Sequence, residues 1–130
     1  MIDIERLIDD VHVTMSLSID LDAQIEVCTG RWAEQHYDAW MRYQECGESC
    51  NPPMAVPIPP NRYTGSADAA FTLIPPGLNV SLVLINGIWY ITIATQENKP
   101  IIYNISHRTL PLTVTGGALR VISALKGDGI

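Results

Sequence analysis

The sequence contains little positive charge. Eight Lys and Arg residues stand against 14 Asp and Glu residues, which gives a formal net charge of −6 at pH 7. Binding to duplex DNA or RNA, or to an anionic membrane surface, needs clustered basic side chains, and these eight are spread along the chain. We therefore expect no nucleic-acid duplex as a partner, although two Arg side chains could still hold a small anionic ligand.

Long apolar runs are also missing. No stretch approaches the length of a membrane-spanning helix. The opening segment Met1–Arg6 is acidic and amphipathic, unlike a secretory signal. We therefore expect a cytoplasmic protein with no membrane partner, in which the Asn-x-Ser sequences at Asn79 and Asn104 are not glycosylation acceptors.

Cysteines are few, and their number is odd. Cys28, Cys46 and Cys50 do not suggest a disulfide framework, although Cys46 and Cys50 could pair under oxidation. Adding His36 gives four side chains of the type that binds zinc, but their spacing matches no common zinc pattern. We expect buried or loop thiols, with no metal and no cofactor.

The apolar content that is present is sufficient for one core. Hydrophobic residues make up 47% of the 130 residues and charged residues 17%, a globular balance. The element order predicts a single α+β domain over residues 1–130, in which helices cover a small antiparallel three-stranded sheet. A variable insert, rich in aromatic residues and proline, occupies about residues 31–62.

Helical periodicity predicts four helices with recognisable ends. The first helix has Asp3 as its cap and an apolar stripe from Ile4 to Met15, and the second has Asp20 as its cap and ends at Gly30. The third runs from a Ser66 cap to Ile74, and the fourth runs from a Thr109 cap to Gly127. In the last helix, Gly116 and Gly117 each cost about 1 kcal/mol against Ala. A close approach to the sheet or a kink would explain them.

The strongest strand signal is a hairpin. Leu78–Ile85 and Ile88–Ala94 flank Asn86-Gly87, the pair that suits a type I′ turn. A third strand is predicted over Ile101–Ile105. Both faces of the hairpin are apolar, so we expect both to be partly covered. An exposed edge strand could pair with a second copy, which would give a homo-oligomer.

Two alternatives remain open for Arg31–Gln44. Its aromatic side chains, from Trp32 to Tyr43, lie at helical spacing, which fits a short helix. They also fit an irregular segment whose aromatics cover the sheet. The five prolines of Gly47–Asn61 indicate a rigid connector.

No catalytic motif is present. Phosphate-binding glycine loops, H-E-x-x-H and G-x-S-x-G are all absent. His107 is the best catalytic candidate, but its neighbour Ser106 would point away from it in an extended segment. Asp68 could act as a base, and its place at a helix start explains it equally well. The balance favours a protein without catalytic activity, with an enzyme using His107 and Asp68 as the alternative.

A ligand pocket is expected where the insert meets the helix that starts at Ser66. Aromatic rings would form a stacking wall, Arg side chains would neutralise an anionic group, and a helix start would offer free N–H groups. The candidate ligand-binding residues are Trp32, Tyr37, Trp40, Arg62, Tyr63, Ser66, His107 and Arg108. In the competing account the aromatics seal the core, and Asp68 occupies the helix start as its own anion.

Three segments carry a family resemblance. They are Leu7–Glu26, which holds Ser18–Ile25, then Tyr63–Gly77, and then the helix around Pro111–Arg120. In this order they resemble short phage and prophage proteins related to the phage ABA sandwich domain. The resemblance covers about half the chain, and the middle segment is its specific part.

The resemblance implies a helix–sheet–helix fold and a phage-encoded accessory protein acting in the host. It implies no active site. We expect counter-defence, through sequestering a small nucleotide-derived signal or blocking a host protein. A small phage enzyme and a virion or assembly component are the alternatives.

Overall fold

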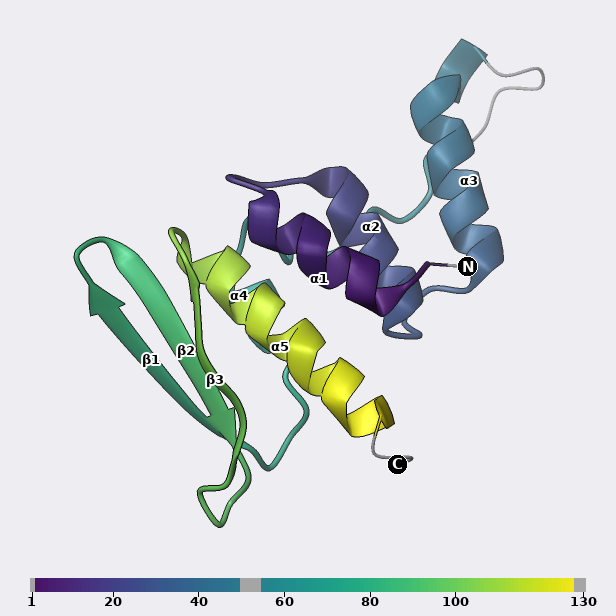
Figure 1. The fold of residues 1–130 in the computed structure, drawn as a ribbon. Helices are drawn as coiled ribbons and strands as arrows, with labels where there is room; N and C mark the ends of the chain where they lie inside the picture. Colours follow the sequence, from purple (N-terminus) through teal and green to yellow (C-terminus); the bar gives the residue numbers. More distant parts are fainter. Residues whose placement is uncertain (1, 50–54, 128–130) are drawn as a thin grey trace.

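Helices form the first part of the chain, and a three-stranded sheet followed by a long helix forms the last part (Figure 1). The computed structural model describes residues 2–49 and 55–127. The elements are α1 (Ile4–Val13), α2 (Ile19–Cys28), α3 (Glu34–Glu45), the 3₁₀ turn η1 (Gly47–Ser49), α4 (Ala67–Phe71), β1 (Asn79–Ile85), β2 (Ile88–Ala94), β3 (Pro100–His107) and α5 (Leu110–Gly127). The predicted single-domain α+β fold is confirmed.

The sheet is an antiparallel meander in the order β1-β2-β3. Asn86 and Gly87 have φ values of 51° and 78° and join Ile85 to Ile88, so the predicted hairpin turn is confirmed. β3 extends beyond the predicted Ile101–Ile105 at both ends. Its pairing with β2 shifts register, and Asn104 has a φ of 51°.

Within the described part of the chain, elements cover only one face of the sheet. All the helices lie on the same side, with α5 against β2 and β3 (Figure 1). Ile91 and Ile93 are fully buried there, whereas Val83 and Ile85, on the other face, are about half exposed. The expectation that both faces are partly covered is therefore wrong for the outer face.

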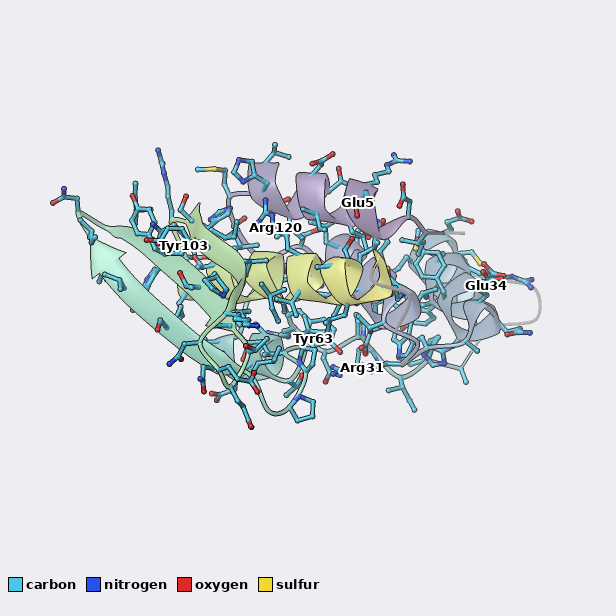
Figure 2. All side chains as sticks on the ribbon, turned by 60° about the horizontal axis from the view of Figure 1, so that its bottom comes forward. Glu5, Arg31, Glu34, Tyr63, Tyr103 and Arg120 are labelled. Atoms are coloured by element: carbon cyan, nitrogen blue, oxygen red, sulfur yellow. The ribbon has the colours of Figure 1, made fainter. Side chains whose placement is uncertain are left out.

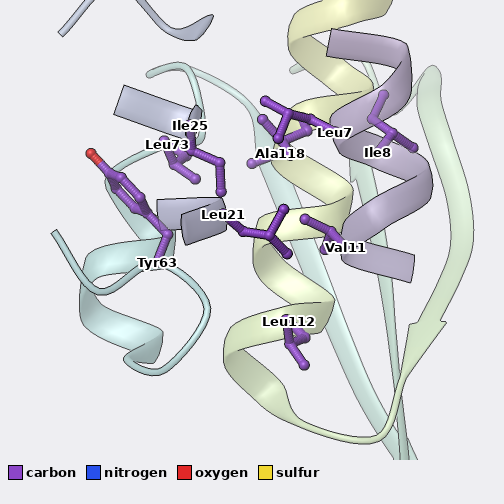
Figure 3. Packing of buried hydrophobic residues seen from close by; sticks show 10 residues of the cluster. Leu7, Ile8, Val11, Leu21, Ile25, Tyr63, Leu73, Leu112 and Ala118 are labelled. Carbon is purple, nitrogen blue, oxygen red and sulfur yellow. The ribbon is translucent and has the colours of Figure 1, made fainter. Parts of the chain in front are cut away.

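Helix α5 is the centre of the core. It contributes Leu112, Ala118 and Leu119 to a cluster with α1 and α2 (Figure 3), and Val114 and Val121 to a second cluster with the sheet. Residues 112–119 are all buried. A helix between two layers has no outer face in its middle turns.

The two adjacent glycines in the middle of α5, Gly116 and Gly117, face different neighbours. A Cβ on Gly117 would lie 2.8 Å from Cγ2 of Ile91, so this glycine permits close contact with the sheet. A Cβ on Gly116 would meet only Nη1 of Arg120 at 3.4 Å and Cγ1 of Val11 at 3.7 Å. The predicted close approach to the sheet is thus found at Gly117.

Three predicted helix starts are confirmed and one is wrong. Thr109 precedes α5 and caps it by accepting from the Leu112 N–H at 3.3 Å. Asp3 caps α1 by accepting from the Glu5 N–H at 3.1 Å, and Ser66 caps α4. The cap of α2 is Ser18, which accepts from the Leu21 N–H at 3.3 Å, whereas Asp20 lies inside the helix.

Some helix ends also differ from prediction. α4 ends at Phe71, before the expected Ile74, and α1 ends at Val13, which leaves Met15 exposed beyond it.

Of the two alternatives for Arg31–Gln44, the helix is found, as α3. The pairing considered for Cys46 and Cys50 falls outside the described residues, because Cys50 is not among them.

Candidate ligand-binding groove

The aromatic residues of the insert pack mainly on one another. The ring of Trp32 lies 4.2 Å from that of His36 and 6.2 Å from that of Trp40, between centroids. Trp40 is buried and also lies 6.4 Å from Tyr43. Trp32 and Tyr37 are half-buried, so these two retain surface for a ligand.

Tyr63 was expected in a stacking wall, but it is fully buried in the core. Its hydroxyl donates to the Glu26 carboxylate and accepts from Nη1 of Arg31 at 2.8 Å and from Nδ2 of Asn61 at 3.3 Å. The Arg31 guanidinium also lies over the Tyr63 ring, 5.6 Å from its centroid (Figure 2). Burial, followed by the bond to Glu26, raises the pKa of Tyr63.

A second buried polar contact fixes the same segment to α2. The Thr64 N–H and hydroxyl both donate to Oδ1 of Asp22 at 2.9 Å. Oδ2 of Asp22 is buried without a hydrogen-bond partner in the part of the chain that the structure describes. Burial raises the pKa of this carboxyl above its ordinary value.

Asp22 and Glu26 were not singled out from the sequence as site residues. Asp22 and Glu26 are four residues apart, and together with Leu21 and Ile25 they form one buried part of α2. Carboxylates interleaved with core residues indicate polar partners inside the protein. This pattern could be seen in the sequence, but it does not show which residues pair with the two carboxylates.

The remaining predicted site residues lie elsewhere. Ser66 caps its own helix, and Arg62 is exposed. His107 and Arg108 line a hollow of about 180 Å³, together with His12, Met15, Ile88 and Ser106. Nδ1 of His107 accepts from the Arg108 N–H at 2.8 Å. The structure therefore does not gather the eight predicted residues in one pocket.

One hollow lies where α1 and α3 begin and α2 and α5 end. It has a volume of about 560 Å³ and is lined by Ile2, Asp3, Ile4, Val27, Cys28, Trp32, Glu34 and Lys126. A neighbouring hollow of about 390 Å³ is lined by Val27, Cys28, Thr29, Gly30, Arg31, Leu73, Pro75, Ile122 and Lys126. The two share Val27, Cys28 and Lys126, so we describe them as one groove with a wide and a narrow part. Of the predicted residues, Trp32 lines this groove, and Tyr37 lines an adjoining hollow of about 180 Å³ that shares Ile2, Val27 and Glu34 with the wide part.

Charge differs between the two parts of the groove. The wide part has two carboxylates, Asp3 and Glu34, and the ammonium group of Lys126. Among the described residues, Arg31 and Lys126 are the only charged ones that line the narrow part. The Arg31 guanidinium is held by Tyr63 and by Thr72, to whose Oγ1 it donates at 3.1 Å. The narrow part therefore favours an anionic group, and one of its two cations is fixed in place.

Cys28 lies at the junction of the two parts. Burial raises the pKa of this half-buried thiol, and the nearby Lys126 charge opposes that shift. A protonated thiol is a weak nucleophile. Within residues 2–49 and 55–127, no group of three or more His, Cys, Asp or Glu side chains could hold a metal ion.

No helix in the described part of the chain has the length and apolar character needed to span a bilayer. Comparisons with protein-family models, curated proteins and solved structures found no match. The chemistry of the groove is therefore the basis for assigning a function.

Proposed function

We propose that the protein is a non-catalytic binding protein that holds a small anionic molecule in the groove. The observation that carries this proposal is the pair of cations, Arg31 and Lys126, which line the narrow part with no other charged residue of 2–49 and 55–127 beside them. A guanidinium and an ammonium group together suit a phosphate or carboxylate.

The wide part suits the rest of such a ligand. Its size falls within the range of small-molecule sites, which combine apolar walls with a few polar groups. Trp32 is half-buried and offers a ring face against which a planar group could stack. Ile2, Ile4 and Val27 supply apolar contacts. A nucleotide-like molecule, with a planar base and a phosphate, has this combination of groups.

Several observations favour binding over catalysis. Burial raises the pKa of Cys28 and so disfavours its thiolate, and no His among the described residues lines either part of the groove. The alternative enzyme using His107 and Asp68 has less support, because Asp68 is not among the residues that line the hollow at His107. General acid–base catalysis needs both groups within reach of one substrate.

The resemblance of Tyr63–Gly77 to phage proteins supports a biological setting for this binding. A phage-encoded accessory protein in the host cytoplasm could sequester a nucleotide-derived signal and so counter a host defence. Binding without turnover is sufficient for that role.

Calorimetric titration with a panel of mono- and dinucleotides, with inorganic phosphate and an uncharged nucleoside as reference ligands, tests the proposal. Lys126→Ala should weaken binding of an anionic ligand by about tenfold or more, because a hydrogen bond to a charged group contributes about 1.5–3 kcal/mol. The matched control is Lys99→Ala, which removes the same charge from the exposed turn between β2 and β3.

The proposal fails if no anionic member of the panel binds, or if the two Lys variants bind alike. A Trp32→Phe variant adds a second readout. Tryptophan fluorescence that changes on ligand addition in the parent protein should respond much less in this variant.

A further inference from the structure

The two edges of the sheet differ in how they are protected. The β3 edge carries Pro100, a positive φ at Asn104 and two register shifts against β2. Proline and bulges are the devices by which proteins prevent an edge strand from pairing with another chain. β1 has neither, and all seven of its residues pair with β2 in unbroken register.

β1 also presents apolar side chains on both of its faces. Val80 and Leu84, on the side of the helices, are 37% and 54% exposed, because α5 lies over β2 and β3 and leaves β1 outside (Figure 1). Val83 and Ile85, on the outer side, are 50% and 53% exposed.

Charge is missing from this strand and from its neighbour. No Asp, Glu, Lys, Arg or His occurs from Ala69 to Gln96, a segment that contains β1, β2 and the last residues of α4. An inward or edge Lys is a common protection of exposed strands, and β1 has none. The net charge of −6 therefore comes entirely from other parts of the chain.

We propose that β1 is a dimerisation edge, at which it pairs antiparallel with β1 of a second copy about a two-fold axis. The two three-stranded sheets would then form one continuous sheet of six strands. Leu82 is the middle residue of β1 and would lie at the axis, with Val80 facing Leu84 of the second copy and Ser81 facing Val83 of the second copy.

The backbone suits this register. In a two-residue turn, the flanking residues Ile85 and Ile88 form a hydrogen-bonded pair, and hydrogen-bonded and non-bonded pairs then alternate along the strands. The N–H and C=O groups of Val80, Leu82 and Leu84 therefore point away from β2. These three residues are symmetric about Leu82, so two copies can satisfy one another's free groups.

A second copy is the occupant that fits best. An uncharged edge with apolar residues on both faces is complemented by a strand of the same kind, and β1 itself is such a strand. A charged partner strand would bring unpaired charges against Val and Leu side chains. β1 itself carries no charged side chain, so like charges do not meet within the shared ladder.

The molecular mass in solution tests the proposal, and sedimentation or light scattering should give twice the 14.3 kDa of one chain. Leu84→Lys should give the monomer, because the two added charges would lie within the shared ladder. The matched control is Tyr103→Lys on β3, at a side chain that is 68% exposed, and it should leave the dimer intact.

Amide hydrogen exchange then tests the strand and its register. In the parent protein the N–H groups of Val80, Leu82 and Leu84 should be protected. In Leu84→Lys they should exchange at least tenfold faster, while Tyr90, within the β1–β2 ladder, stays protected and shows that the sheet is folded. If Leu84→Lys fails to fold, Val83→Lys replaces it.

Three outcomes would overturn the proposal. They are a parent protein that is monomeric at its highest soluble concentration, a dimer that survives the lysine on β1, and a dimer in which these three amides exchange freely. None of them bears on ligand binding in the groove, whose test uses different residues.

Discussion

Replacing the two adjacent glycines of α5 with alanine should change stability in opposite directions. Both lie in the buried middle of the same helix, so the gain in helix propensity is the same at each. Their surroundings differ. A Cβ on Gly116 meets nothing closer than 3.4 Å, whereas one on Gly117 would come within 2.8 Å of Ile91 and 3.2 Å of Ile102.

The magnitudes follow from these contacts. Gly116→Ala should stabilise by about 0.5–1 kcal/mol, because alanine loses less backbone entropy than glycine on entering a helix. At Gly117 the same gain is opposed by overpacking, which costs about 1–3 kcal/mol. Ile91 cannot move aside cheaply, because it is fully buried and the contacting methyl belongs to a β-branched side chain with a restricted χ1. Gly117→Ala should therefore destabilise by about 0–2 kcal/mol.

Urea unfolding followed by far-UV circular dichroism, at one protein concentration, measures both effects. With a slope of about 2 kcal/mol per molar urea, the midpoint should rise by up to about 0.5 M for Gly116→Ala and fall by up to about 1 M for Gly117→Ala. Equal stabilisation by the two substitutions would refute the assignment of Gly117 as the point of close helix–sheet contact.

Three further predictions concern the buried polar groups and the thiol. Tyr63→Phe should cost about 1–3 kcal/mol in urea unfolding, because the buried Glu26 carboxylate loses a donor, and a smaller loss would mean that water replaces the hydroxyl. Burial raises the pKa of Asp22, so its contribution to stability is complete below the ordinary value of 3.8 and is lost as the pH rises through the raised value. The free energy of unfolding of Asp22→Asn, measured with urea at several pH values, should therefore increase relative to that of the parent protein as the pH rises. A difference that stays constant with pH would contradict this. Burial also raises the pKa of Cys28, so iodoacetamide should modify it more slowly at neutral pH than in the unfolded chain, as followed by peptide mass spectrometry, and equal rates would count against a buried thiol.

The parts of the fold that were predictable depend on local chemistry. Asn86 and Gly87 specify their turn through the φ values that only a few residue types adopt readily. Ser66 and Asp3 cap helices with side chains that reach only two or three residues ahead. In each case the signal and the structure that it specifies lie within the same few residues.

The cap of α2 shows where local chemistry is insufficient. Ser18 and Asp20 are both good capping residues, and they lie two positions apart. The choice is made from a distance, because the Ser18 N–H donates to Oγ1 of Thr64 at 2.8 Å and so fixes the chain before the helix. A contact between residues 46 positions apart leaves no pattern in either segment.

The candidate site depends on such distant contacts throughout. The predicted pocket combined aromatic and basic residues chosen by their type. The fold separates them, with Tyr63 in the core and His107 beside α1. The groove is instead built from the starts of α1 and α3 and the ends of α2 and α5. Lys126 and Ile2 line it together because α1 packs on α5. Of the ligand-binding residues predicted from the sequence, Trp32 lines it and Tyr37 lines the adjoining hollow.

The position of α5 in the chain has a consequence for synthesis. It follows all three strands, yet it joins the α1 cluster to the sheet cluster. On the ribosome, Ile91 and Ile93 therefore emerge before the residues that cover them. Until α5 emerges, the apolar face of the sheet is exposed, and so is the uncharged β1 edge. Exposed strands of this kind are prone to aggregate. A nascent chain that stalls before Leu110 should consequently require chaperone binding, and folding should occur late, once α5 is released.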